Sequence, residues 1–199
     1  MEYIIKVVQK LKNNNVGGII KARMKEFKEN RMGDVFKELC FCILTANFNA
    51  EKSIKIQEEI GDGFLTLSET ELATRLRQLG HRYPNVRARY IVEARKHELK
   101  LEADVFKMRE WLVNNVKGIG YKEASHFLRN VGYEDVAILD FHILNILEKY
   151  NVIKKPKSLT KRRYLEIEEK MREIAKRLEI SLGELDLYLW YIETGKVLK

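Results

Sequence analysis

The chain has 199 residues, 45% of them hydrophobic, which is enough to bury a core in one compact unit or two small subdomains. Its 37 Lys and Arg against 29 Asp and Glu give a formal net charge of +8, which favours a polyanionic partner such as nucleic acid, although many basic proteins simply carry solvated lysines. No apolar run approaches the roughly 18 residues of a membrane span, and no charged leader opens the chain, so we expect a cytoplasmic, prokaryotic protein that has no targeting signal and does not interact with membranes.

Helical periodicity runs through nearly the whole chain. Apolar residues recur every three or four positions, as in segment 35–44, and no sustained alternation with a period of two occurs. Ser68 and Ser181 each stand three positions before a glutamate, which is the spacing of a helix capping box. The sequence therefore predicts an all-α protein. We expect helices at residues 2–12, 18–29, 33–46, 50–60, 69–79, 86–98, 103–116, 121–131, 141–150, 161–178 and 182–193.

Residues 154–163 form the one segment with the composition of a linker. They hold Pro156, Ser158 and six basic residues, and they separate two strongly periodic segments. We expect this segment to cross the surface in contact with solvent.

A short turn with two glycines, at 117–120, joins two predicted helices. Gly118 and Gly120 permit positive φ values, and such a turn directs backbone N–H groups outward at a helix N-terminus, where a phosphate oxygen is favoured. Lys117 adds a charge, so the segment can hold a DNA backbone without reading its sequence. The alternative is an ordinary connection between helices that ends at a glycine. A helix-hairpin-helix motif is favoured by the apolar positions that flank the anchor Ile119, namely Trp111, Leu112, Val116, Ala124, Phe127 and Leu128.

Lys122 and Asp140 form the candidate catalytic pair. Lys122 lies in the first turn of the helix after the hairpin, where the helix dipole disfavours a protonated amine, and Asp140 follows the apolar run 136–139. An amine can attack the sugar carbon of a nucleotide and form a Schiff base, while a carboxylate stabilises the positive charge that develops on the sugar. Taken singly, Lys122 resembles a solvated lysine and Asp140 an N-cap, and the N-cap role is compatible with catalysis.

Three segments resemble one branch of the helix-hairpin-helix glycosylase superfamily. The sequences FKELCFCILTAN at 36–47, GIGYKEASHF at 118–127 and TGKVLK at 194–199 are similar to the archaeal-type (type 2) 8-oxoguanine DNA glycosylases, and the resemblance covers nearly the whole chain. The resemblance implies a bifunctional base-excision repair enzyme that removes 8-oxoguanine by Schiff-base chemistry and then nicks the strand by β-elimination, as an AP lyase. The implied partner is double-stranded DNA that contains an oxidised purine.

The resemblance also implies a domain organisation within a single glycosylase unit, 1–199. A central helical bundle would cover 33–131, with the hairpin at 111–131, and a second helical subdomain would combine 1–30 with 136–199. The active-site cleft would lie between the two, with Lys122 and Asp140 facing each other. Phe141 departs from the family pattern, because many relatives carry a polar or basic residue after the aspartate, so contacts with the DNA backbone nearby are expected to differ.

Base recognition is predicted at five positions. An extruded nucleotide leaves a gap in the stack, and Asn47 stands where related glycosylases insert a glutamine or asparagine, although it also suits a local helix C-terminus. Asp186 and Trp190, four apart on the last helix, offer a carboxylate beside a flat ring, although such a tryptophan is commonly a core residue. The resemblance implies that Trp190 stacks on the base, Asp186 helps to hold it and Tyr83 covers its other face. It also brings the terminal carboxylate of Lys199 near the N7–H of the oxidised guanine, where a frayed terminus is the alternative.

No metal or cofactor is predicted. The four histidines lack metal-ligand spacing, and two cysteines are too few for an iron–sulfur cluster. Cys40 and Cys42 point to different faces of a predicted helix, which argues against a mutual disulfide and fits a reducing cytosol. No nucleotide-binding phosphate loop is present, and a monomer is the default expectation.

Three other functions stay open at this point. A glycosylase-lyase for oxidised pyrimidines shares the lysine and aspartate, but it usually carries a cysteine cluster that this chain lacks. A noncatalytic DNA-binding module would use the hairpin alone and would bind a duplex without cleaving it. An all-α protein-interaction domain would show no salt-sensitive affinity for DNA.

Overall fold

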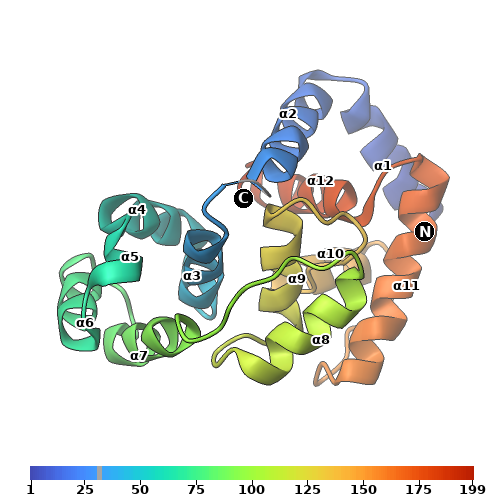
Figure 1. Ribbon diagram of the computed structural model, residues 1–199. Helices are drawn as coiled ribbons and strands as arrows, with labels where there is room; N and C mark the ends of the chain where they lie inside the picture. Colours follow the sequence, from blue (N-terminus) through green and yellow to red (C-terminus); the bar gives the residue numbers. More distant parts are fainter. Residues whose placement is uncertain (31–32) are drawn as a thin grey trace. The chain divides into compact units, whose positions relative to one another are not determined.

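A computed structural model of the protein describes residues 1–30 and 33–199 (Figure 1). Within these ranges the chain forms helices and no strands, which confirms the predicted all-α class. The helices are α1 (Glu2–Lys12), α2 (Asn15–Glu29), α3 (Val35–Thr45), α4 (Ala50–Ile60), α5 (Gly63–Thr66), α6 (Glu69–Gln78), α7 (Pro84–Ala94), α8 (Val105–Asn115), α9 (Tyr121–Asn130), α10 (Phe141–Lys149), α11 (Lys161–Leu178) and α12 (Leu182–Thr194).

Side-chain caps begin most of these helices. Ser68 and Glu71 form the predicted capping box, in which the Glu71 N–H donates to Ser68 Oγ (3.3 Å) and the Ser68 N–H donates to Glu71 Oε2 (2.9 Å). At α12, Ser181 Oγ accepts a hydrogen bond from the N–H of Glu184 (3.1 Å). Local sequence therefore fixes where both helices start.

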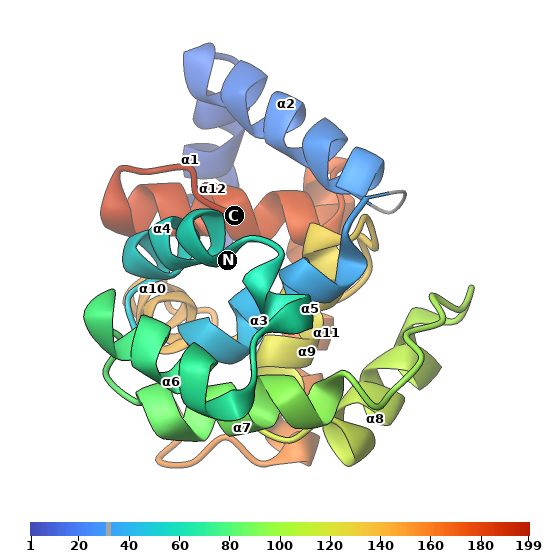
Figure 2. The same cartoon turned by 60° about the vertical axis from the view of Figure 1, so that its left-hand side comes forward.

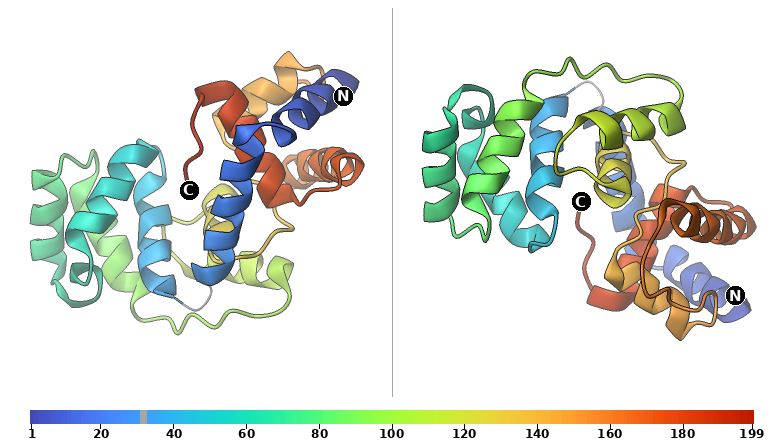
Figure 3. Two further views of the ribbon diagram at one scale, coloured as in Figure 1. Left: turned by 90° about the horizontal axis from the view of Figure 1, so that it is seen from above. Right: turned by 90° about the horizontal axis from the view of Figure 1, so that it is seen from below.

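The described residues divide into two compact units. One combines residues 1–30 with 128–199, and the other holds the described residues from Gly33 to Phe127. In the first unit, α12 packs against α1, α2, α10 and α11, and Figure 3 shows these helices from two sides. In the second unit, α7 packs against α3, α5 and α6, and α3 also contacts α4 (Figure 2).

Helix α11 holds the segment that leads into α10. Tyr164 is buried, and its hydroxyl donates to the carbonyl of Ala137 (2.6 Å) and accepts from the N–H of Leu139 (3.2 Å). Glu168 Oε1 accepts from the N–H of Ala137 (2.7 Å). These bonds satisfy backbone groups of a buried extended segment that has no strand partner. They also fix the position of Asp140, which follows directly.

Candidate active site

The turn between α8 and α9 has the backbone that its two glycines permit. Gly118 has a φ of +83°, and a Cβ added there would lie 2.4 Å from the ring of Tyr90 on α7, so only glycine fits. Ile119 is buried and anchors the turn. The N–H of Ile119 donates to Val116 O (3.2 Å), and the N–H of Gly120 donates to Glu123 Oε2 (3.2 Å). These two N–H groups are therefore occupied within the chain, and a phosphate would use other groups of the turn or displace Glu123.

Lys122 occupies the second position of α9. Its side chain is 24% exposed, and its Nζ lies 3.4 Å from Glu123 Oε1. Glu123 thus contacts both the hairpin backbone, at Gly120, and the amine that is the candidate nucleophile. A carboxylate at this distance can hold the amine in place, so Glu123 links the position of the candidate nucleophile to that of the hairpin.

Side chains of helix α7 contact the hairpin and the residue before Asn47, so this helix links the predicted DNA-binding positions of the unit. Arg87, Tyr90 and Glu93 are spaced three apart, so they lie along one side of the helix. Glu93 pairs with Lys117 Nζ (3.1 Å), and the ring of Tyr90 lies against Gly118. Arg87 Nη2 donates to the carbonyl of Ala46 (2.5 Å), immediately before Asn47. Sequence reasoning missed this role of α7, because the three side chains resemble an ordinary solvated face.

Asn47 and Tyr83 lie at the ends of helices in the same unit. Asn47 is exposed and has a φ of +56°, in the left-handed region that asparagine tolerates better than most residues. Tyr83 is half-buried at the N-cap position of α7, and the guanidinium of Arg82 lies 5.1 Å from its ring centroid. Asn47, Tyr83, the hairpin and Lys122 thus belong to one unit.

Asp140 lies in the other unit, as the N-cap of α10. Its Oδ1 accepts a hydrogen bond from the N–H of Ile143 (2.9 Å), and this is the one hydrogen bond that its carboxylate makes among the described residues. The side chain is half-buried. Capping therefore uses one oxygen and leaves the other for a positive charge that develops nearby.

An aromatic cluster combines Phe141 and His142, the two residues after Asp140, with Trp190 on α12. The ring of His142 meets that of Trp190 edge-on, with centroids 4.8 Å apart, and the ring of Phe141 lies tilted by 36° against that of His142, with centroids 3.7 Å apart. Phe141 is 61% exposed, whereas Trp190 is partly buried and its Nε1 has no hydrogen-bond partner among the described residues. Partly exposed aromatic rings of this kind suit the stacking of nucleobases.

Asp186 is less accessible than the sequence suggests. It is 4% exposed, and its Oδ2 lies 2.5 Å from Nη1 of Arg129, which also binds Asn130 Oδ1 and covers the ring of Phe27. One oxygen is thus committed to a buried ion pair. Lys199, also in this unit, lies four residues beyond Gly195, which ends α12 with a φ of +72°.

Neither cysteine offers a reactive thiol. Cys40 and Cys42 are both buried and neither forms a disulfide, and burial raises the pKa of the Cys40 thiol well above its usual value. Among residues 1–30 and 33–199, no group of three or more His, Cys, Asp or Glu side chains is arranged to hold a metal ion. None of the helices that the structure describes combines the length and apolar character needed to cross a membrane.

An all-helical chain with a glycine hairpin, a lysine directly after it and a capping aspartate downstream defines a protein of the helix-hairpin-helix class. Residues 20–180 match a family model described as 8-oxoguanine DNA glycosylase. The chain is 56% identical over 205 aligned positions to the 8-oxoguanine DNA glycosylase/AP lyase of Korarchaeum cryptofilum, with 98% of both chains covered.

Two crystal structures are closely similar to the present one. The Methanocaldococcus jannaschii 8-oxoguanine glycosylase/lyase, in complex with a 15mer DNA containing 8-oxoguanine, has a TM-score of 0.96 and 53% identity, with 99% of this chain and all of that chain covered. The 8-oxoguanine DNA glycosylase of Thermotoga maritima has a TM-score of 0.93 and 47% identity, with 100% of this chain and 99% of that one covered. The chain therefore belongs to the 8-oxoguanine DNA glycosylase family, which confirms the resemblance seen in its sequence.

Proposed function

We propose that the protein removes 8-oxoguanine from double-stranded DNA and then cleaves the strand at the abasic site. The observation that carries this proposal is the similarity over 98% of the chain to a relative named 8-oxoguanine DNA glycosylase/AP lyase. The predicted nucleophile, Lys122, lies two residues after Gly120, in the first turn of α9.

The chemistry follows from an amine and a carboxylate. The neutral amine of Lys122 attacks C1′ of the damaged nucleotide, so that a C–N bond forms while the bond to N9 of the base breaks, and the base leaves with a proton. Asp140 stabilises the positive charge that the sugar carries in the transition state. The C1′–O4′ bond of the sugar ring then breaks, O4′ takes up a proton and the nitrogen lone pair completes the protonated C1′=N bond of the Schiff base. Loss of a proton from C2′ gives an enamine that expels the 3′-phosphate, which breaks the C3′–O bond and nicks the strand.

The remaining predicted residues bind the DNA. Trp190 stacks on the extruded base, Tyr83 covers its other face, and the terminal carboxylate of Lys199 accepts the N7–H that distinguishes 8-oxoguanine from guanine. Asp186, one turn before Trp190 on α12, helps to hold the base, with one oxygen bound to Arg129. The gap in the stack is filled by Asn47.

The backbone of the DNA is held at the hairpin by Lys117, Gly118 and Gly120. None of these steps calls for a metal or a small-molecule cofactor.

Borohydride trapping tests the proposal. A duplex with one 8-oxoguanine opposite cytosine is incubated with the wild-type protein, with Lys122→Gln, and with Lys107→Gln as a control at an exposed lysine on α8. We expect a covalent complex with the wild type and the control, and none with Lys122→Gln. A trapped complex with Lys122→Gln would move the nucleophile to another residue. A wild type that binds the duplex but neither cross-links nor releases the base would favour a noncatalytic hairpin module.

A further inference from the structure

His81 connects two segments that the proposed function uses. It lies three residues before Pro84, the first residue of α7, and is 4% exposed. Its Nδ1 accepts a hydrogen bond from the N–H of Tyr83 (3.0 Å), and its Nε2 lies 3.1 Å from the carbonyl of Leu44, near the end of α3. A backbone N–H can only donate and a carbonyl can only accept, so both bonds form only when the ring is neutral with its proton on Nε2.

The same region is fixed at two further points. The ring of Phe48 lies on that of His81, with centroids 4.2 Å apart. Arg87, 7% exposed, donates to the carbonyl of Ala46. Residues 44, 46 and 48 are therefore all held from α7 and the residues before it, and Asn47 protrudes from the turn between them with a left-handed backbone.

We propose that His81 is a positioning residue, whose neutral ring holds the Asn47 turn and the Tyr83 loop in one arrangement so that both act on the same extruded nucleotide. This inference rests on the proposed function, in which Asn47 fills the gap in the stack and Tyr83 covers the base. It adds a residue that touches neither the base nor the sugar.

The arrangement is sensitive to acid. A proton on Nδ1 would face the N–H of Tyr83, two donors would oppose each other, and that bond would be lost. Burial lowers the pKa of His81, and the positive charge of Arg87 on α7 lowers it further. The hydrogen bond to the carbonyl of Leu44 raises this pKa, but by less than burial lowers it. The group of α3 that faces the His81 ring is the carbonyl of Leu44. The group that faces it from the turn after α3 is the uncharged ring of Phe48.

The lowered pKa fixes the direction of the pH effect. Because the folded protein binds the proton less readily than the unfolded chain, the stabilisation from neutral His81 is complete above the ordinary value of about 6.5. It is lost as the pH falls from there through the lower value of the folded state. Base excision that depends on the linked segments should therefore decline on the acid side.

Two substitutions separate the two hydrogen bonds. His81→Asn keeps an acceptor near the position of Nδ1 and loses the bond to Leu44, whereas His81→Gln keeps a donor near Nε2 and loses the bond to Tyr83. We expect each to slow single-turnover excision of 8-oxoguanine from a duplex by about 10- to 100-fold, the effect of a misplaced contact. Cleavage at a preformed abasic site, which leaves no base for Tyr83 to cover, should slow by no more than about threefold.

A pH series provides the second readout. For the wild type, the ratio of the excision rate to the rate of abasic-site cleavage should fall only on the acid side of the ordinary histidine value of about 6.5, because the buried ring takes up its proton at a lower pH. For His81→Asn the ratio should stay flat, because asparagine does not titrate. Melting temperatures identify a variant that fails to fold.

Each remaining outcome would overturn the inference in a recognisable way. Variants that excise the base as fast as the wild type remove the role of His81 and leave the proposed function standing. Variants that lose both activities together with much of their melting temperature show a purely structural histidine. A wild type that neither excises nor cross-links overturns the proposed function and this inference with it.

Discussion

Asp140 combines two tasks that substitution can separate. The Asp140→Asn variant would keep an oxygen that accepts from the N–H of Ile143, since asparagine caps helices as well as aspartate does. It would lack the charge that stabilises the sugar. We expect Asp140→Asn to slow base excision by about 10²- to 10³-fold while the melting temperature stays within about 2 °C of the wild type.

Asp140→Ala is the matched variant, because it removes both the cap and the charge. It should lose a similar factor in excision rate and also about 1 kcal/mol in the free energy of unfolding. Single-turnover excision and thermal melting of the three proteins measure the two effects separately. Equal excision by Asp140→Asn and the wild type would leave Asp140 with the cap alone.

Residue by residue, the sequence predicts local roles better than distant partners. The capping position of Asp140 follows from its place before an amphipathic run. The buried partner of Asp186 does not, because Arg129 lies 57 positions earlier in the chain and resembles any basic residue in the last turn of a helix. The hydrogen bonds of His81 are hidden for the same reason, since one of them spans 37 positions.

At the scale of the hairpin, Gly118 meets two constraints that act together. Its φ of +83° strains any residue with a side chain, and a Cβ would overlap the ring of Tyr90. We expect Gly118→Ala to destabilise the fold by about 1–3 kcal/mol and to weaken duplex binding. Denaturant unfolding and a binding titration with an undamaged duplex measure both.

Gly18→Ala is a suitable control for the hairpin variant. Gly18 lies inside α2, and a Cβ there would meet no atom within 4 Å. Alanine should therefore stabilise α2 by about 0.5–1 kcal/mol and leave DNA binding unchanged. If Gly118→Ala unfolded and bound DNA as the wild type does, the turn would not need a glycine at this position.

Among the elements, the long periodic helices were predicted, the shortest helix was missed, and the start of a helix with two glycines was placed too late. Eleven of the helices correspond to predicted ranges, whereas α5, with 4 residues, is too short to show a periodic pattern. Helix α2 begins at Asn15 rather than residue 18, because Asn14 caps it by accepting from the N–H of Val16 (2.9 Å). Two successive glycines, Gly17 and Gly18, concealed this start.

For the molecule as a whole, sequence periodicity predicts where the helices are but not which helices pack against one another. Residues 1–30 pack with the C-terminal segment rather than with the helices that follow them in the chain. The end of α9, from Leu128, belongs to the same unit, where Arg129 pairs with Asp186 and Asn30 Nδ2 donates to Asn130 O (3.3 Å). Such contacts depend on the three-dimensional path of the chain, which local pattern does not encode.

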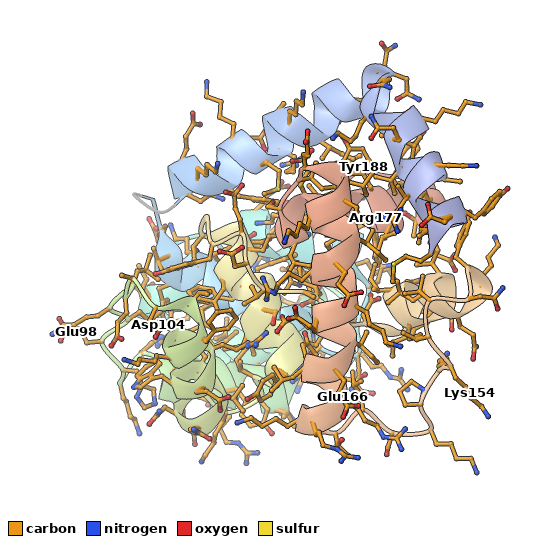
Figure 4. All side chains as sticks on the ribbon, turned by 90° about the vertical axis from the view of Figure 1, so that its right-hand side faces the viewer. Glu98, Asp104, Lys154, Glu166, Arg177 and Tyr188 are labelled. Carbon is orange, nitrogen blue, oxygen red and sulfur yellow. The ribbon has the colours of Figure 1, made fainter. Side chains whose placement is uncertain are left out.

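Basic residues gather in the segment before α11 and in the first turn of that helix. Lys154, Lys155 and Lys157 are exposed on the segment before α11, where Figure 4 shows Lys154. The first turn of α11 adds three cations and no acidic residue, although a helix N-terminus favours acidic residues. A nearby polyanion would relieve this repulsion. We expect duplex affinity to fall steeply with salt, and the triple Lys→Gln variant at these positions to reduce the slope of log K against log[salt] by up to about 2.7.

A second triple variant separates local from overall charge. The control replaces three exposed lysines of α1 and α2 by glutamine, namely Lys6, Lys10 and Lys25. Each triple variant loses three positive charges, so both have a formal net charge of 8 − 3 = +5. If the segment before α11 contacts phosphates, its variant changes the salt slope and this control changes it by much less, because the slope counts the counterions released at the contacts and not the total charge. Equal slopes for the two triple variants, in fluorescence-anisotropy titrations between about 50 and 200 mM salt, would assign the effect to net charge and remove the segment from the DNA-binding surface.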